Sequence, residues 1–200
     1  MANVIKLRKG LNIHLKGTAA QTKRVVGACT EYVVRPDTFE GVVPKLVVHE
    51  GDRVDVGDAL FVDKNFPEVK FASPVSGTVK AVERGERRKI LGIRLQADEV
   101  QKYHDFGRRD VSSLSADGVK NALLEAGLFG YIYQLPYAVS TNPQTMPKAI
   151  FVSALRDMPL ANDFEYELQG NERDFQTGLT ALSKMATTYL GIGKNQRADV

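Results

Sequence analysis

The sequence predicts an α+β protein of two domains, a β-rich first half followed by an α/β second half. From Val4 to about Leu95, short apolar runs rich in β-branched residues alternate with Gly, Pro and Asp, which is typical of β-strands. After Leu95, apolar residues at helical spacing alternate with compact strand-like runs, as in parallel α/β units. We expect an N-terminal β segment packed on the rest (1–35), a β-barrel domain (36–100) and an α/β domain (101–200) that is incomplete at its C-terminus.

The first half contains seven apolar runs that we expect to be strands, namely residues 25–26, 32–34, 42–43, 46–48, 60–62, 79 and 90–91. A weak internal repeat relates residues 47–60 to residues 74–86, since each has a strand followed by charged residues around a glycine. We expect these glycines to supply the positive φ of tight hairpin turns.

The second half predicts a strand, a helix and a strand in the order of a parallel unit. A first helix is expected after Ser115 as its N-cap and before Gly127 as its stop. A strand over 148–153, a helix beginning at Asn171 or Glu172 and a strand over 189–192 follow. Because one such unit cannot cover both faces of a parallel sheet, we expect this chain to be part of a longer protein.

Composition excludes several classes of function. The formal charge of +3 is far from the concentrated basic surface that binds nucleic acid, so no nucleic-acid partner is expected. Cys29 is the only cysteine, which excludes an intramolecular disulfide and an iron–sulfur cluster held by four thiolates of this chain. No stretch approaches the roughly 20 apolar residues of a membrane span. We expect no metal site, because His14, His49 and His104 are far apart in the sequence and lack the carboxylate or cysteine companions of a recognisable metal site.

Residues 50–60 and 73–79 resemble the two arms of a lipoyl or biotinyl carrier domain, which is a flattened barrel-sandwich. A carrier presents one modified lysine at the turn between its arms. Here that position falls on Phe66 and Pro67, and Lys64 comes three residues early. The resemblance therefore implies a barrel-sandwich domain without a carrier lysine, used as a docking module; a lipoyl-like carrier is the alternative.

A closer resemblance depends on several stretches in order: residues 4–17 (VIKLRKGLNIHLKG), 31–36, 60–64, 71–79, 84–88, 113–115, 125–129 and 150–154. Together they resemble the A subunit of the bacterial Na⁺-translocating NADH:quinone oxidoreductase, with Asn12 where that family usually has aspartate. The C subunit of the electron-transport complex is an alternative, but it adds ferredoxin-like cysteine clusters that would have to lie beyond Val200.

The resemblance implies a peripheral subunit on the cytoplasmic side of the bacterial inner membrane. Its partners would be the other subunits of the complex, especially the membrane subunits. That complex oxidises NADH, reduces ubiquinone or menaquinone and exports sodium ions. The resemblance also implies that partner subunits carry the FMN, FAD and Fe–S centres, that this chain binds none of them, and that quinone is its candidate ligand.

The α/β half is similar to the Rossmann-like domain of the flavin-binding subunit of respiratory complex I, where a glycine-rich loop approaches the flavin phosphate. The corresponding residues 127–137 carry Phe129, Tyr131 and Tyr133 where glycine is needed, so a vestigial flavin site is expected. These three residues and Tyr137 are candidates for the walls of a quinone-side pocket. The alternative is that they pack the barrel against the α/β domain.

Other polar residues give weaker signals. No catalytic residue is assigned, because no nucleophile–base arrangement is recognisable. Three acidic residues follow the strand ending at residue 153, at the edge where α/β folds bind ligands: Asp157, Asp163 and Glu165. The densest basic run lies on an expected hairpin and predicts either a solvated face or a surface that docks on acidic neighbours or anionic lipid: Arg84, Arg87, Arg88, Lys89 and Arg94.

Overall fold

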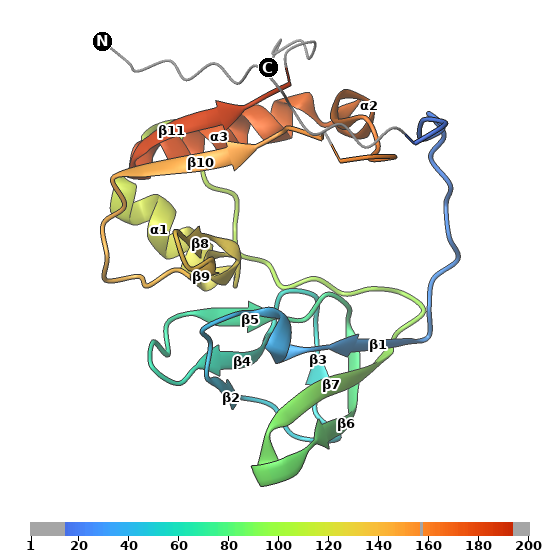
Figure 1. Cartoon of the computed structure of the whole chain (residues 1–200). Coiled ribbons are helices and arrows are strands. Elements are labelled where there is room, and N and C mark those ends of the chain that lie inside the picture. The colour runs from blue at the N-terminus through green and yellow to red at the C-terminus, as the bar shows by residue number, and fades with distance from the viewer. Residues whose placement is uncertain (1–14, 157, 194–200) are drawn as a thin grey trace.

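The computed structural model describes residues 15–156 and 158–193 and shows a β-barrel sandwich below an α/β domain (Figure 1). The elements of the first domain are β1 (Glu31–Val34), η1 (Pro36–Thr38), β2 (Pro44–Leu46), β3 (Arg53–Val54), β4 (Ala59–Asp63), β5 (Lys70–Ala72), β6 (Gly77–Arg84), η2 (Glu86–Arg88) and β7 (Ile90–Ala97). They form two antiparallel sheets with strand orders β1-β7-β6-β3 and β2-β4-β5.

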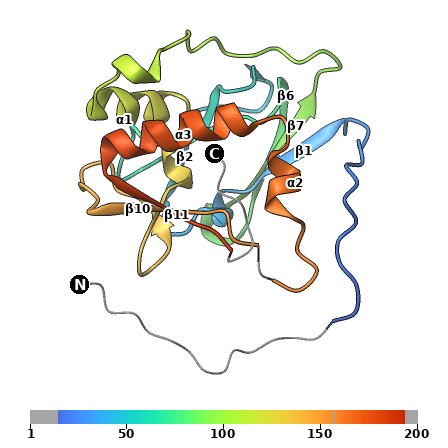
Figure 2. The same cartoon turned by 90° about the horizontal axis from the view of Figure 1, so that it is seen from above.

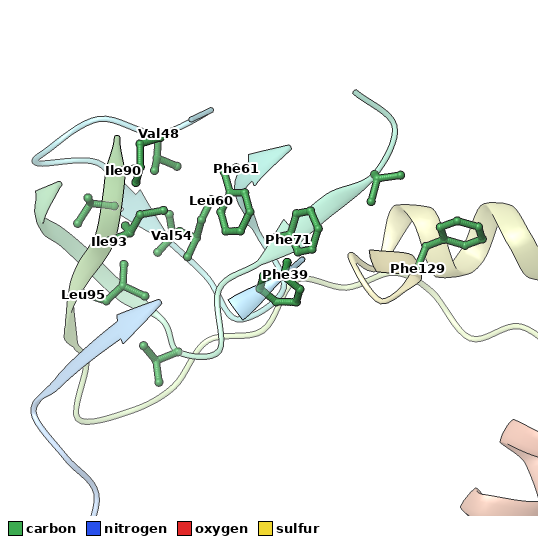
Figure 3. Packing of buried hydrophobic residues seen from close by; sticks show 13 residues of the cluster. Phe39, Val48, Val54, Leu60, Phe61, Phe71, Ile90, Ile93, Leu95 and Phe129 are labelled. Atoms are coloured by element: carbon green, nitrogen blue, oxygen red, sulfur yellow. The ribbon is translucent and has the colours of Figure 1, made fainter. Parts of the chain in front are cut away.

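The core of the barrel lies between these two sheets and is rich in aromatic rings (Figure 3). Phe61 on β4 pairs with Phe71 on β5, and the two rings stack with centroids 4.5 Å apart. Phe39, which follows η1, tilts against Phe71 with centroids 4.4 Å apart. Aromatic pairs of this kind contribute beyond their burial, so the three rings are a main source of the stability of the barrel.

Charged side chains on the outer face join β1 to the β6–β7 hairpin. Arg94 on β7 binds Glu83 on β6 and, at 3.2 Å, Glu31 on β1. Lys80 pairs with the same Glu31 carboxylate. Hydrogen bonds from Lys80 and then from Arg94 lower the pKa of Glu31. The network therefore fixes β1 as the edge strand of the four-stranded sheet.

The strands expected at residues 32–34, 60–62, 79 and 90–91 are confirmed in β1, β4, β6 and β7. The strands expected at residues 25–26 and 42–43 are wrong. Val25 and Val26 are 96% and 79% exposed, and none of the described strands pairs with them, so their β-branched side chains gain nothing from an extended pairing there. Val43 lies in the loop before β2, where its carbonyl accepts a hydrogen bond from the Lys64 N–H.

The prediction that glycines supply the positive φ of the turns holds in one arm of the repeat only. Gly51 and Gly57 have φ of +93° and +100° in turns of the first arm. Gly85, in contrast, has an ordinary φ of −98°. Arg87 and Arg88, with φ of +53° and +61°, turn the chain at the tip of the β6–β7 hairpin instead.

The α/β domain comprises η3 (Val111–Ser113), α1 (Ala116–Glu125), η4 (Phe129–Tyr131), β8 (Tyr133–Gln134), β9 (Val139–Ser140), β10 (Ala149–Ser153), α2 (Phe164–Leu168), α3 (Glu172–Met185) and β11 (Thr187–Gly191). The expected caps are confirmed, since the Ser115 hydroxyl accepts a hydrogen bond from the Gly118 N–H and Gly127 has a φ of +69°. The expected parallel pairing is confirmed too, because β10 and β11 pair in parallel on either side of α3 in the chain.

One face of the β10–β11 pair packs on α3, and the other is open (Figure 2). Ile150 and Val152 are half-buried, whereas Phe151 between them is exposed. Phe151 stacks on Tyr189 of β11 on the open face, with centroids 5.4 Å apart. The alternation of burial along β10 is that of a strand covered on one side.

The two domains meet where the chain leaves α1. A Cβ atom added at Gly127 would lie 3.0 Å from the Cβ of Ala72 on β5. A Cβ added at Gly130 would lie 2.5 Å from the ring of Phe71. The backbone of the α/β domain thus touches the barrel directly, through two positions that have no room for a side chain.

Substituting these contact positions should separate backbone strain from domain packing. Gly127→Ala introduces a positive-φ alanine that also presses on β5, whereas Gly51→Ala introduces the same strain where nothing lies within 4 Å. We expect Gly51→Ala to lower the free energy of unfolding by about 1 kcal/mol, and Gly127→Ala to lower it by about 1–3 kcal/mol more through overpacking. Urea unfolding measures both values, and equal losses would contradict the domain contact.

Candidate functional site

A mostly apolar cavity of about 920 Å³ lies in the α/β domain between α1, η4, β8, β10 and α3. Its walls include aliphatic side chains of two of these elements and of the residue that follows η4: Ile150 and Val152 of β10, Leu182 and Met185 of α3, and Ile132. The volume is in the range of pockets that hold a small organic ligand.

Three of the four aromatic candidates line this cavity: Phe129, Tyr131 and Tyr133. Tyr137 does not, and its side chain is 81% exposed in the turn between β8 and β9. Residues 127–133 position the other three in η4 and β8, directly after the Gly127 stop of α1. The structure therefore places three candidates at one site and excludes the fourth from it.

The lining aromatics differ in how firmly they are held. Phe129 is 4% exposed and belongs to the same buried cluster as Phe39 and Phe71, at the edge nearest the α/β domain (Figure 3). Tyr131 is half exposed, and its ring meets Phe39 edge-on with centroids 5.1 Å apart. Tyr133 is also about half exposed. The packing alternative thus describes Phe129 and part of Tyr131, while Tyr133 remains accessible.

A few polar groups surround the cavity. Burial, and secondarily the neighbouring Tyr133, raises the pKa of the Tyr131 phenol. Tyr131 therefore keeps its proton at neutral pH and offers a hydrogen-bond donor. At the α1 side, the Lys120 ammonium lies 3.4 Å from the carbonyl of Pro143 and 4.0 Å from Asp117. The site combines apolar walls with a neutral donor, two lysines (Lys120 and Lys148) and the carboxylate of Asp117.

The backbone beside the cavity has few free donors for a phosphate. The N–H groups of Gly127 and Leu128 donate to carbonyls of α1, and those of Tyr131 and Ile132 donate to carbonyls within the η4 turn. Phosphate loops need such N–H groups directed at the ligand. Here four of the six N–H groups of residues 127–132 donate to carbonyls of the chain, and the glycines face the barrel.

The other candidate residues are dispersed. His104 binds Asp58 at 2.8 Å, and His49 lies 3.5 Å from Asp52. Asp163 is the N-cap of α2, a helix that the sequence analysis missed, where it accepts a hydrogen bond from the Glu165 N–H. His14 and Asp157 lie outside the described residues. Within residues 15–156 and 158–193, no group of three or more His, Cys, Asp or Glu is placed to hold a metal ion.

Lys64 lies outside the strands. It is the first residue of the loop between β4 and β5, and its side chain is exposed. Its own N–H donates to the Val43 carbonyl at 2.8 Å, which holds it against the base of the loop. Phe66 and Pro67 occupy the middle of that loop. An unmodified lysine here stays a prediction.

The described helices include none with the length and apolarity needed to cross a membrane.

Sequence reasoning missed Phe39, which supports Tyr131, and the α3 side of the cavity. Phe39 is an isolated aromatic in a loop, so no periodicity marks it. Leu182 and Met185 lie in the helix expected from residue 171 or 172, but nothing in the sequence places that helix against residues 149–153.

A barrel-sandwich followed by an α/β domain places the chain in the class of two-domain barrel-sandwich proteins. Residues 5–98 match the family model described as the NqrA N-terminal barrel-sandwich hybrid domain, and residues 114–200 match the NqrA second alpha/beta domain. The chain belongs to the NqrA family, whose curated relatives are named as the A subunit of the Na(+)-translocating NADH-quinone reductase.

Three of these relatives show how much of the family's length is covered. The protein of Pseudomonas aeruginosa (strain UCBPP-PA14) is 32% identical over 94% of this chain and 42% of its own length. Those of Yersinia pestis and Actinobacillus pleuropneumoniae serotype 5b (strain L20) are 33% and 35% identical, each over 91% of this chain and 41% of their own length. The chain thus spans about two fifths of the length of these relatives.

Two aromatic residues of the same stretch should respond differently to truncation. Phe129→Ala removes a buried ring from the cluster that joins the domains, and we expect it to lower the free energy of unfolding by about 3–5 kcal/mol. Tyr137→Ala changes an exposed side chain, and we expect a change within about 0.5 kcal/mol. Denaturant unfolding of both variants measures the difference; similar values would contradict the structural role of Phe129.

Proposed function

We propose that this chain forms the first two domains of a peripheral subunit of a Na⁺-translocating NADH:quinone oxidoreductase, and that its cavity binds the head group of a quinone. The observation that carries the proposal is the apolar cavity of about 920 Å³ walled by Phe129, Tyr131 and Tyr133. In this proposal the subunit works at the cytoplasmic side of the bacterial inner membrane, docked on the other subunits of the complex.

The chemistry of the cavity suits a quinone better than a nucleotide. A quinone ring is flat and apolar with two carbonyl oxygens, so it needs flat apolar walls and neutral hydrogen-bond donors. The Tyr131 phenol, which is protonated at neutral pH as a tyrosine ordinarily is and whose pKa burial raises further, is such a donor. Tyr133 adds a second hydroxyl on the same wall.

A flavin phosphate, in contrast, would need the backbone that the η4 turn has already engaged. The N–H groups of Gly127, Leu128, Tyr131 and Ile132 all donate to carbonyls of the chain. This supports a vestigial flavin site, with FMN, FAD and Fe–S centres carried by partner subunits. The chain would then contribute structure and a quinone-side surface to the activity of the complex.

Calorimetric titration with a short-chain ubiquinone analogue tests the quinone proposal. Tyr133→Ala removes a half-exposed wall of the cavity and should weaken binding about five- to tenfold, the equivalent of roughly 1–1.4 kcal/mol. Tyr137→Ala is the matched control, since it removes the same side chain outside the cavity and should leave affinity unchanged.

Saturable binding that is insensitive to Tyr133 would place the ligand elsewhere, and no binding at all would overturn the proposal for this chain. A preparation that carries bound flavin would contradict the vestigial flavin site, because the engaged backbone amides would have had to reopen.

A further inference from the structure

A cluster of cationic side chains occupies the end of the β6–β7 hairpin, and we call it the basic tip: Arg84, Arg87, Arg88 and Lys89. All four side chains are exposed. Glu86 is the only carboxylate in residues 84–89, so this short segment has a net charge of +3. Figure 1 shows the hairpin projecting from the barrel on the side away from the α/β domain.

The basic tip lacks the ion pairs that neutralise the base of the same hairpin. At the base, Arg94 and Lys80 are paired with Glu31 and Glu83. At the tip, none of the four cations forms an ion pair with any residue that the structure describes. The fold thus leaves a local excess of positive charge for an external partner.

A carboxylate of a neighbouring element that the charge of Lys89 reaches is already engaged. Asp37 of η1 pairs with Arg35 at 2.8 Å. The hydrogen bond from Arg35 is the main cause that lowers the pKa of Asp37, and the charge of Lys89 adds only a smaller attraction. Asp37 therefore does not neutralise the basic tip.

The backbone of the basic tip has an unusual conformation. Arg87 and Arg88 are both in the left-handed region, which disfavours residues other than glycine. The turn is closed by hydrogen bonds from the Gly85 N–H to the Lys89 carbonyl at 2.8 Å and from the Lys89 N–H to the Glu86 carbonyl at 3.1 Å. Two consecutive arginines in this conformation are an unfavourable choice for a turn alone.

One apolar side chain accompanies the charges. Leu91, the second residue of β7, is 41% exposed and lies beside Gly85, where an added Cβ would be 3.2 Å from it. The end of the hairpin therefore combines cationic groups with a partly exposed aliphatic group on a convex projection. This combination suits the interfacial region of a bilayer, where cations meet phosphates and an aliphatic group reaches the acyl boundary.

We propose that the basic tip binds the surface of a membrane that contains anionic phospholipid. A projecting hairpin with several exposed cations can approach a planar layer of phosphates, whereas recognition of an acidic protein requires a complementary surface. The chain belongs to a family whose relatives are named as subunits of a Na⁺-translocating reductase. In the function proposed above, this subunit works at a membrane, so a membrane surface would lie close to it. This inference does not depend on quinone binding.

Cosedimentation of the whole chain with vesicles of phosphatidylcholine and phosphatidylglycerol tests the proposal. Each Lys or Arg at an anionic surface contributes roughly a fivefold factor, so Arg87→Gln with Arg88→Gln should weaken partitioning about 20- to 30-fold. Arg108→Gln with Arg173→Gln removes the same charge from exposed positions outside the hairpin and should have little effect. Arg87→Lys with Arg88→Lys keeps the charge and should retain binding.

The dependence on lipid and salt provides further controls. Binding should vanish on pure phosphatidylcholine and weaken as salt shortens the Debye length. Equal losses in the tip and control variants, undiminished binding to neutral vesicles, or no vesicle binding at all would each overturn the proposal. Unchanged thermal unfolding of the tip variant would show that its loss of binding does not arise from misfolding.

Discussion

The close approach of the α/β backbone to β5 is the constraint on which the rest of the structure depends. Gly127 and Gly130 lie against Ala72 and Phe71 with no room for side chains, so the chain leaving α1 is held on the barrel. Because η4 is fixed there, Phe129 enters the shared core and Tyr131 meets Phe39. The cavity then forms on the opposite side of η4, between it and α3. The cavity wall formed by η4 is thus held in place by its packing on the barrel.

The same contact limits the chemistry available to the α/β domain. Most N–H groups of this turn donate to carbonyls of the chain, so few remain to bind an anion. The glycines of the turn pack on the barrel. What it can offer is aromatic surface and the neutral phenol of Tyr131. The packing that stabilises the domain contact therefore also determines which groups line the cavity.

Periodicity predicted most of this architecture because the period of a buried face is written in the sequence. The helix between Ser115 and Gly127, the parallel β10–β11 pair and the two-domain division all followed from spacing and caps. Patterns failed where tertiary contacts decide. Residues 25–26 have strand-forming side chains but no partner strand, and Phe39 is isolated in sequence yet central in the core. At the site, the sequence grouped four aromatics, but only the fold separates Tyr137 from the others.

The contrast between the two ends of the β6–β7 hairpin shows how geometry decides what a charge can do. At the base, Arg94 is neutralised by two carboxylates and helps to hold β1 in the sheet. At the tip, the four exposed cations form no ion pair with the described residues. The backbone at Arg87 and Arg88 lies in the left-handed region. Exposed charges act only over about 8 Å at physiological salt. Cations lying flush with the barrel would be kept away from a flat surface by the barrel itself, whereas the projecting hairpin brings them within that distance.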